Sequence, residues 1–503
     1  MLQRAHPPIH LIKALRHCVS WGFVVFGLLM SGLASAQPSV DWATRWGIPG
    51  TMSAGRDAAQ ATDGSLYVIG TSDTYPEWGP TTTSLLHLSL NGDTLWTRTY
   101  GNRYGLSFTS MALSPYGEIV LAGNAEVSDT VGGFALMKLS AEGDSVWTRL
   151  YHVGNSHGIA VKSLPDGGFV ACGNMRPDTG HALGVLLIFR TDSAGNERWF
   201  TTIDRGTITS FSGGDVTLMP DGGFAAVSFC TGYPVPLGSL FVRLGAFGDT
   251  LWTRAFDGDS GRDFPYSIFP TPDGGTITAG YTLIGDPGGA YRYAGTVSKV
   301  GPAGDLEWRR EYADGDWSGF CDISPAIGGG YIACGYLQPP DLPHIITYLV
   351  KLTENGDTVW TTYYWTSGQS YAQSLVRLQD GSYLTAGSEQ PFPLGEEQIL
   401  TIHFGAENAV SPFILPPSSF ILSCFPNPFN PTTTISFSLP HSAKVEVNIF
   451  DITGRLVETL ADQRFEAGAH SLIFDGSSLP SGIYFARLRA GEFVKTQKMV
   501  LLK

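Results

Sequence analysis

Cysteine is scarce in this chain of 503 residues, and histidine is not much commoner. One of the six cysteines, Cys18, lies in an apolar N-terminal segment, and the other five are too few for a disulfide scaffold. No histidine stands at H-E-x-x-H or at another zinc-binding spacing. We therefore expect no disulfide-dense fold, no metal site, no metal-dependent hydrolysis and no cofactor.

Long apolar runs are absent after residue 36, so no transmembrane span is expected in the mature chain. The run from Trp21 to Leu33 is too short to cross a bilayer, and only basic charges precede it. Ala34-Ser35-Ala36 has the A-x-A pattern of a cleavage site. Residues 1–36 therefore predict a secretory signal peptide cut between Ala36 and Gln37, with an uncleaved anchor as the alternative.

Positive charge is also limited, with 31 Lys and Arg against 45 Asp and Glu, which gives a net charge of −14. An acidic surface repels nucleic acid and anionic membranes, so neither is expected as a partner. What the chain has in quantity is 62 Gly, 31 Pro and 12% aromatic residues. This composition is typical of short strands joined by tight turns.

A tryptophan recurs along the chain, in most copies within Trp-Thr-Arg or a relative of it. In six copies a basic residue precedes the tryptophan by nine positions, with a Gly/Asn/Asp turn such as Asn91-Gly92-Asp93 between them. A constant spacing predicts a hairpin of fixed length. The tryptophans are Trp42, Trp96, Trp147, Trp199, Trp252, Trp308 and Trp360. The strands before the turns end in the basic residues His87, Lys138, Arg190, Arg243, Lys299, Lys351 and His403.

A second turn, such as Asp166-Gly167-Gly168, also recurs in every period and is followed by another strand. Two hairpins per period make four strands, and such a unit cannot bury its faces alone. Trp42 has no basic partner before it and His403 has no tryptophan after it, so the two ends complete one unit together. The pattern predicts an all-β fold with a seven-bladed β-propeller over residues 37–408. An open β-solenoid is the alternative, but it does not explain the two ends.

The repeats over about residues 40–405 resemble those of bacterial secreted propellers, a resemblance that implies fold and little about function. We expect the aligned basic residues to pair with turn carboxylates and the tryptophans to pack in the core or between blades. The stretch from Asp192 to Trp199 bears a faint similarity to quinoprotein docking motifs, without a cofactor pocket to accompany it.

Residues 409–423 read as a linker, and residues 424–503 as a small immunoglobulin-like β-sandwich. The motifs Phe425-Pro426-Asn427-Pro428-Phe429-Asn430-Pro431, 451–455 (DITGR), 479–484 (LPSGIY) and 498–503 (KMVLLK) resemble the type A sorting domain of the type IX secretion system. The resemblance implies passage through the periplasm to the outer-membrane translocon, followed by release or attachment at the cell surface. The secretion machinery is thus an expected partner. An ordinary immunoglobulin-like stalk is the alternative.

No catalytic group is predicted. The match to G-x-S-x-G at 154–158 is expected by chance and lacks the strand–turn–helix setting of a nucleophile elbow. The loop carrying Asp257, Asp259 and Asp263 has oxygen ligands suited to Ca²⁺, but a solvated turn fits it better because Arg262 replaces the glycine of an EF-hand. Cys321 and Cys334 flank a turn symmetrically, which suggests a disulfide across a hairpin as a hypothesis.

The loops that vary in length between repeats predict the binding face. They join the second strand to the third and the fourth to the next unit, and both kinds emerge at the same end of a propeller. Aromatic residues in loops on a rigid scaffold are suited to stacking on sugars or to contact with proteins. The alternative is that they only cap the channel of the propeller. The residues expected to form this face are Tyr75, Trp78, Tyr104, His157, Tyr266, Tyr291, Trp317, Trp365 and Tyr371.

The sequence therefore favours a secreted or cell-surface propeller that binds an extracellular glycan or protein. One alternative is a propeller glycosidase or lyase, which would need paired carboxylates converging on the channel. A structural cell-surface component is the other alternative, consistent with the regular repeats.

Overall fold

The architecture comes from a computed structural model, in which every regular element of the described residues is a β-strand. The structure describes residues 38–74, 81–101, 105–128, 131–152, 156–175, 184–204, 208–232, 238–256, 262–285, 292–312, 315, 317–339, 342, 344–366, 368–391, 395–406, 421–425, 429–439, 442–465, 468–491 and 493–502. Within these ranges no helix is long and apolar enough to cross a membrane. The all-β prediction is confirmed.

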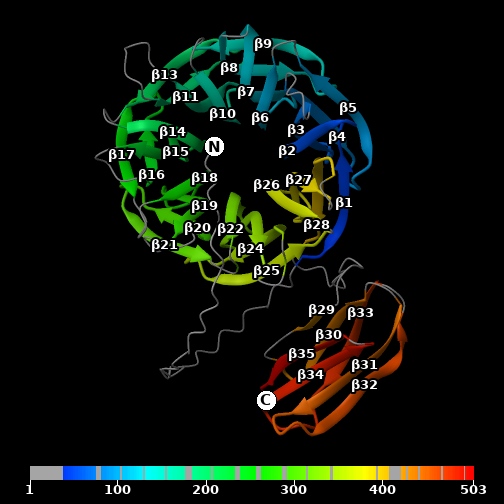
Figure 1. Ribbon diagram of the computed structural model, residues 1–503. Helices are drawn as coiled ribbons and strands as arrows, with labels where there is room; N and C mark the ends of the chain where they lie inside the picture. The colour runs from blue at the N-terminus through cyan, green and yellow to red at the C-terminus, as the bar shows by residue number, and fades with distance from the viewer. Residues whose placement is uncertain are drawn as a thin grey trace, which may run out of the picture. The chain divides into compact units, whose positions relative to one another are not determined.

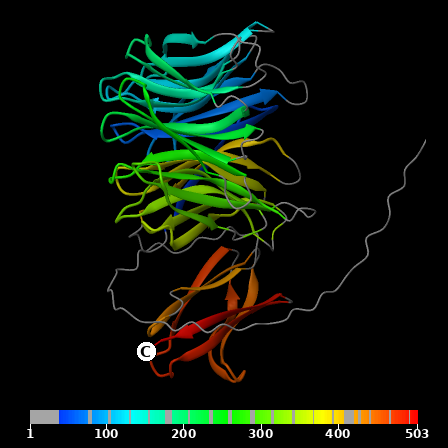
Figure 2. The same ribbon diagram turned by 90° about the vertical axis from the view of Figure 1, so that its left-hand side faces the viewer.

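Strands β1 to β28 form four-stranded antiparallel units arranged around a ring, with the first strand of each unit innermost (Figure 1). Seen from the side, the strands run between the two faces of the ring (Figure 2). The units are β2 (Thr51–Gln60), β3 (Leu66–Thr74), β4 (Thr82–Leu88) and β5 (Thr94–Tyr100); β6 (Leu106–Leu113), β7 (Ile119–Ser128), β8 (Val131–Leu139) and β9 (Ser145–Tyr151); β10 (Ser156–Ser163), β11 (Phe169–Met175), β12 (Val185–Thr191) and β13 (Glu197–Ile203); β14 (Ile208–Leu218), β15 (Phe224–Gly232), β16 (Gly238–Leu244) and β17 (Thr250–Phe256); β18 (Asp263–Pro270), β19 (Thr276–Ile284), β20 (Arg292–Val300) and β21 (Leu306–Tyr312); β22 (Trp317–Pro325), β23 (Tyr331–Gln338), β24 (Ile346–Leu352) and β25 (Thr358–Tyr364); and β26 (Gln369–Arg377), β27 (Tyr383–Gln390), β28 (Gln398–Phe404) and β1 (Val40–Trp46).

The last of these units is assembled from both ends of the chain. Strand β1 pairs antiparallel with β28, so that Val40 faces Phe404 and Trp46 faces Ile399. The Gly405 amide donates to the Ser39 carbonyl at 2.8 Å, which extends the pairing past the strand ends. This arrangement confirms the interpretation of the two incomplete repeats. It pairs β28 on both sides and makes β1 the outer strand of the last unit.

Most of the aligned basic residues pair with a carboxylate of the turn before the second strand, as predicted; these are Lys138, Arg190, Arg243 and Lys299. His87 and His403 instead pair with the hydroxyls of Ser65 and Ser382 in that turn. Arg190 lies 2.5 Å from Asp166 in the β10–β11 turn, and Lys299 lies 2.7 Å from Asp273 in the corresponding turn. The turn carboxylate also accepts a hydrogen bond from the backbone amide of the residue two positions later in the chain. In this way Asp166 accepts from the Gly168 amide at 3.0 Å. The pair thus joins the third strand of a unit to the turn before its second strand. Lys351 differs, because its turn is three glycines, and it donates to the Ile327 carbonyl at 2.9 Å.

The tryptophans pack between units, as predicted. A Cβ placed on Gly92, in the β4–β5 turn, would lie 2.7 Å from the ring of Trp42 in the preceding unit. The turn therefore needs glycine for two reasons, since the φ angle of Gly92 is also +84°. The same contact joins Trp96 to Gly143, Trp147 to Gly195, Trp199 to Gly248, Trp252 to Gly304 and Trp308 to Gly356.

Each innermost strand contains an irregular step, with two in β14, and these strands line the centre of the ring. The pairing of β2 with β3 shifts between Gly55 and Asp57, and that of β22 with β23 shifts between Phe320 and Asp322. The shift at β22 leaves Cys321 without a cross-strand partner and places Cys334 opposite Asp322. Both cysteines are free thiols, so the disulfide hypothesis is wrong. Its symmetrical spacing around the turn took no account of the extra residue in the bulge.

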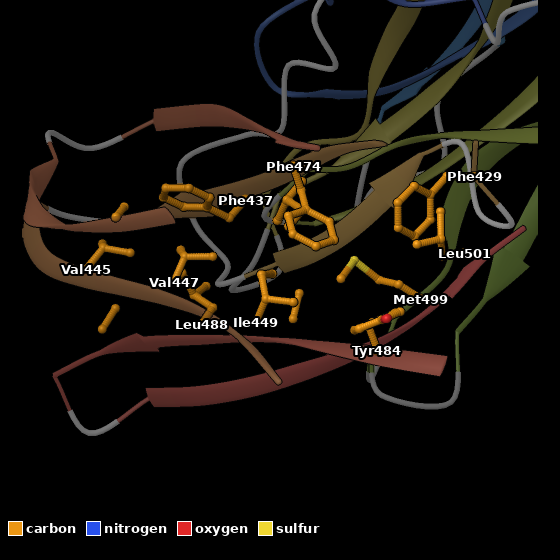
Figure 3. Close-up of a cluster of buried hydrophobic side chains, with 14 of the residues drawn as sticks. Phe429, Phe437, Val445, Val447, Ile449, Phe474, Tyr484, Leu488, Met499 and Leu501 are labelled. Carbon is orange, nitrogen blue, oxygen red and sulfur yellow. The ribbon is translucent and has the colours of Figure 1, made fainter. Parts of the chain in front are cut away.

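The C-terminal strands form two sheets, in the orders β29-β30-β33 and β32-β31-β34-β35. Side chains from both sheets, among them Phe437, Val447, Phe474 and Leu488, are buried together between them (Figure 3). Phe429 is 2% exposed, and its amide donates to the Val500 carbonyl at 2.9 Å, which ties the start of the segment to its last strand. The strands are β29 (Ile421–Phe425), β30 (Thr432–Leu439), β31 (Ala443–Asp451), β32 (Leu456–Phe465), β33 (Gly468–Asp475), β34 (Gly482–Ala490) and β35 (Phe493–Leu501).

Substitution of Gly92 by alanine tests the contact with tryptophan, with Gly64→Ala as the matched control. Both glycines have positive φ, +84° and +88°, but no atom lies within 4 Å of a Cβ on Gly64. Gly64→Ala should cost about 1–2 kcal/mol of unfolding free energy from backbone strain. Gly92→Ala should cost about 1–3 kcal/mol more, because Trp42 must move. Thermal unfolding of both variants measures the difference, and equal losses would contradict the packing argument.

Candidate functional site

Five of the residues predicted for the binding face are in the described part of the chain. They are His157, Tyr266, Trp317, Trp365 and Tyr371, and each lies at or near the end of a strand that adjoins one of the variable loops. We call this side of the ring the variable-loop end, and the side with the short hairpin turns the tight-turn end. Tyr75, Trp78, Tyr104 and Tyr291 lie outside the described residues, as do Ala36 and Gln37.

Aromatic rings at the variable-loop end touch one another across three neighbouring units. Phe264 stacks on Phe229 and on Tyr281, with centroid distances of 3.9 and 4.6 Å. Tyr281 lies 5.4 Å from Tyr293, which lies 4.8 Å from Trp317. Tyr266 lies beside this row, 5.7 Å from Tyr281. We call the six residues Phe229, Phe264, Tyr266, Tyr281, Tyr293 and Trp317 the aromatic arc.

The strand register explains how the aromatic arc forms. Phe264 and Tyr281 are directly opposite in the pairing of β18 with β19, and Tyr293 pairs with Trp317 between β20 and β22. The bulge between Pro265 and Ser267 takes Tyr266 out of the ladder. As a result, Tyr266 and Trp317 expose 41% and 47% of their surface, while Phe229 is buried. The aromatic arc therefore presents two open rings on a row of packed ones (Figure 1 shows the strands β15, β18, β19, β20 and β22 that carry it).

A buried ion pair fixes the start of the strand that supplies Phe264 and Tyr266. Arg309 donates through Nε and Nη2 to both carboxylate oxygens of Asp263 at 2.8 Å, and through Nη1 to Glu311 at 2.6 Å. Burial lowers the pKa of the Arg309 guanidinium, but the two carboxylates outweigh burial, and the net shift is upward. Asp263 is 5% exposed, so the prediction of a solvated acidic turn is wrong for this residue. Asp257 and Asp259 lie outside the described residues.

The phenol groups around the aromatic arc stay protonated at neutral pH. Burial raises the pKa of Tyr281, and burial raises the pKa of Tyr266 and of Tyr336 well above the ordinary range. Tyr336 lies over Gly319, where a Cβ would come within 2.6 Å of its hydroxyl oxygen. A protonated phenol both donates and accepts a hydrogen bond, so these hydroxyls can serve a neutral polar ligand.

The other three predicted residues are not part of the aromatic arc. The Tyr371 hydroxyl donates to Glu397 at 2.6 Å and is half-buried. Trp365 packs beside Tyr363, at a centroid distance of 5.9 Å, against a buried cluster. His157 is exposed on β10. Tyr281 and Tyr336 were not predicted from the sequence, because aromatic residues within a strand are usually buried in the core.

A polar cluster occupies the centre of the ring. Lys162 of β10 lies 3.2 Å from Asp215 and interacts electrostatically with Asp57 and Asp322, which belong to other units. Burial lowers the pKa of the Lys162 ammonium, but these carboxylates outweigh it, so its pKa lies above the ordinary value. Burial raises the pKa of Asp57, and it raises that of Asp322 to about 6, with Lys162 opposing the shift in both cases.

The central carboxylates also connect one unit to the next. Asp57 accepts the Met111 amide and Asp322 accepts the Leu375 amide, each at 2.8 Å from the neighbouring innermost strand. Asp57 further accepts the Ser374 hydroxyl at 2.8 Å, from the unit on its other side. Paired carboxylates at the channel were the requirement for a glycosidase, and the ones present are engaged with backbone amides. No group of His, Cys, Asp and Glu in the described ranges could hold a metal ion.

The ring of four-stranded antiparallel units defines an all-β, propeller-like protein. At its C-terminal end, residues 423–502 match the family described as the secretion system C-terminal sorting domain. The chain therefore carries a type IX sorting domain, and the resemblance seen in its motifs is confirmed. Its place is outside the cell, in the medium or at the cell surface, and its sorting domain implies interaction with the secretion machinery.

Several solved structures are similar to this chain at low identity. PorZ, an essential surface component of the type IX secretion system of Porphyromonas gingivalis, is 12% identical over 87% of this chain and 69% of that chain, with a TM-score of 0.34. An α-L-arabinanase of Penicillium chrysogenum is 12% identical over 75% and 98%, with a TM-score of 0.37. A subtype N11 neuraminidase-like protein of A/flat-faced bat/Peru (H18N11) is 10% identical over 76% and 98%, with a TM-score of 0.39. No curated protein sequence matches the chain.

Replacement of Lys162 by methionine should make stability more sensitive to pH. Asp322 has a folded pKa of about 6, above the unfolded value, because burial favours its protonated form. Its contribution to the free energy of unfolding is therefore greatest below about pH 4 and is lost as the pH rises through 6. Removing Lys162 raises the pKa of Asp57 and Asp322 further, so Tm should fall more at pH 8 than at pH 5. Arg98→Met, at an exposed pair 3.8 Å from Asp144, is the control and should change Tm little at either pH. Equal losses for Lys162→Met at both pH values would contradict the electrostatic role.

Deletion of residues 424–503 should separate folding from export. The C-terminal segment has its own buried core, so the remaining chain should fold and stay in the periplasm of a host that has the type IX system. Cell fractionation with immunodetection, compared with the full chain, measures this. Delivery of the truncated protein to the cell surface would contradict the sorting role.

Proposed function

We propose that this protein is a seven-bladed β-propeller, over residues 37–408, that the sorting domain delivers outside the cell to bind an extracellular glycan. The signal peptide of residues 1–36 begins this route, and the linker of residues 409–423 separates the propeller from an immunoglobulin-like sorting domain at 424–503. Strands β2–β5 and the units that follow them, with β26–β28 and β1 as the last, supply the seven blades.

The aromatic arc is the observation that supports binding. Tyr266 and Trp317 expose 41% and 47% of their surface although they are large rings, and the packed Tyr281 and Tyr293 connect them. Burial of an exposed ring by a ligand is favourable, and rings already held in place lose little entropy on binding. The variable loops adjoin this end of the ring, which is where binding residues concentrate on a rigid scaffold.

A glycan fits the aromatic arc better than a protein partner does. Sugars combine apolar C–H faces, which stack on rings, with hydroxyls, which pair with groups such as the protonated phenols of Tyr281 and Tyr336. The charged groups next to the arc, Asp263, Arg309 and Glu311, are occupied with one another, which favours a neutral ligand. A protein partner and a purely structural surface component are the alternatives.

The enzyme alternative has less support than binding. A glycosidase needs one carboxylate free to donate a proton and a second free to act as base or nucleophile. Asp57, Asp215 and Asp322 each accept backbone amides from their own and neighbouring strands, and Lys162 interacts with all three. Their arrangement serves the assembly of the ring.

Alanine substitution at Trp317 and at Tyr266 tests the proposal. Each should weaken binding to the glycan found by an oligosaccharide array by roughly tenfold, because a stacking ring is lost. Tm should fall less than for a fully buried ring, because Tyr266 and Trp317 are 41% and 47% exposed. Tyr116→Ala is the matched control, since Tyr116 is 75% exposed in the β6–β7 turn at the tight-turn end. Loss of binding in the control alone would show that the wrong end was chosen, and array binding by neither wild type nor variants would contradict a glycan ligand.

A further inference from the structure

The sheet of strands β32, β31, β34 and β35 in the sorting domain has two faces of different kinds. Every second side chain, among them Val447, Ile449 and Leu488, points into the buried core (Figure 3). The side chains that alternate with these lie on the opposite face, which we call the outer face. A sheet with one covered face normally carries polar side chains on the other. The residues of the outer face therefore indicate whether this sheet has a second partner.

One end of the outer face is apolar. In the strand register Leu456 lies opposite Phe450, and Phe450 lies opposite Phe485. Ile483 and Val500, which are also opposite each other, form the next row. Leu456 is 51% exposed, and the other four side chains are half-buried. We call these five residues the apolar patch, and none of them belongs to the buried core of the sandwich.

The second sheet of the same domain provides an internal comparison. The outward side chains of β30 and β33 that the structure describes are Thr432, Thr434, Ser471, Ile473 and Asp475. Only Ile473 among them is apolar, so this face is polar, as contact with solvent favours. The apolar patch is thus a property of one face of the domain. Apolar side chains gathered on an exposed face are typical of an interaction site.

Basic side chains border the apolar patch. The Arg487 guanidinium lies 4.4 Å from the centroid of the Phe450 ring in a cation–π contact, and Lys498 lies at the end of the same row of the sheet. Strands β34 and β35 carry two further basic residues, Arg489 and Lys495, and no acidic one. The whole chain has a net charge of −14, so this border is opposite in sign to most of the molecule.

At the other end of the outer face the charged groups have partners within the domain. Lys444 lies 2.8 Å from Asp462, and Arg464 donates to the Ser442 hydroxyl at 3.0 Å. Arg487, by contrast, forms no ion pair with a carboxylate in the part of the chain that the structure describes. A carboxylate on a partner can therefore bind Arg487 without displacing an internal pair.

The family match implies that this domain meets the secretion machinery. We propose that the apolar patch, with Arg487 and Lys498, is the surface by which the domain binds an acidic protein of that machinery. An apolar centre on the partner covers the rings, and carboxylates around it pair with the basic border. Such carboxylates attract this face and repel the rest of an acidic chain, so the sorting domain docks and the cargo does not. An anionic lipid surface fits less well, because half-buried rings on a flat sheet offer little to insert among acyl chains.

Export of the full chain in a host that has the type IX system tests this surface, with cell fractionation and immunodetection as the measurement. Arg487→Glu reverses an exposed charge, and Phe485→Thr removes a ring of the apolar patch. Each should lower the fraction delivered outside the cell by roughly tenfold, the effect of losing one strong interface contact. The matched controls are Arg464→Glu, at the other end of the same face, and Ile473→Thr, on the other sheet. Both controls should be exported as the wild type is.

Three results would overturn the proposal. They are normal export of both Arg487→Glu and Phe485→Thr, equal retention of the two controls, and binding of the full chain to phosphatidylglycerol vesicles that Arg487→Glu abolishes, which would show a lipid surface. The Tm of the retained protein, purified from the periplasm, separates lost docking from misfolding. Arg487→Glu alters an exposed side chain, so its result does not depend on Phe485→Thr folding normally. Trp317→Ala should be exported normally, which separates this surface from the aromatic arc.

Discussion

Four antiparallel strands cannot cover both of their own faces, and this constraint governs the rest of the structure. Each unit must bury its faces against two neighbours, which a chain can provide for every unit only by closing a ring. The contacts between units are specific as well as apolar. Asp57 and Asp322 hold the amides of the next innermost strand, and the tryptophans lie over the turn glycines at the periphery. The ring is thus joined at both its inner and its outer circumference.

The same contacts explain how the two ends of the ring can carry different side chains. Strand positions are set by the turns and by the contacts between units, so a side chain at a strand end can vary without loss of the fold. At the variable-loop end this freedom accommodates Tyr266 and Trp317. At the tight-turn end Tyr116 and Phe247 are exposed in the β6–β7 and β16–β17 turns.

The repeat could be predicted from the sequence because its spacing is constant, and the incomplete repeats at Trp42 and His403 identified the closing strands. The sorting domain was equally predictable from its motifs. The bulge at Cys321 was not, because it adds one residue without any sign in the composition, and it invalidated the disulfide hypothesis. The cluster of Lys162 with Asp57, Asp215 and Asp322 was not predicted, because its members come from four different units and meet only in the closed ring. Tyr281 was hidden for a different reason, because its alternation in β19 is that of a buried strand.

The pairing of β1 with β28 has a kinetic consequence for a protein that is exported. Val40 pairs with Phe404, and almost the entire propeller lies between these two residues in the sequence. The ring can close only when both are present. Loop closure over this separation costs about 2–3 kcal/mol more than closure of a hairpin of about 20 residues, so closure is expected late in folding. Until then both terminal strands have open edges, which can pair with other chains. The sorting domain begins only a short distance after β28, so a chain that presents it has already delivered the strand that completes the ring.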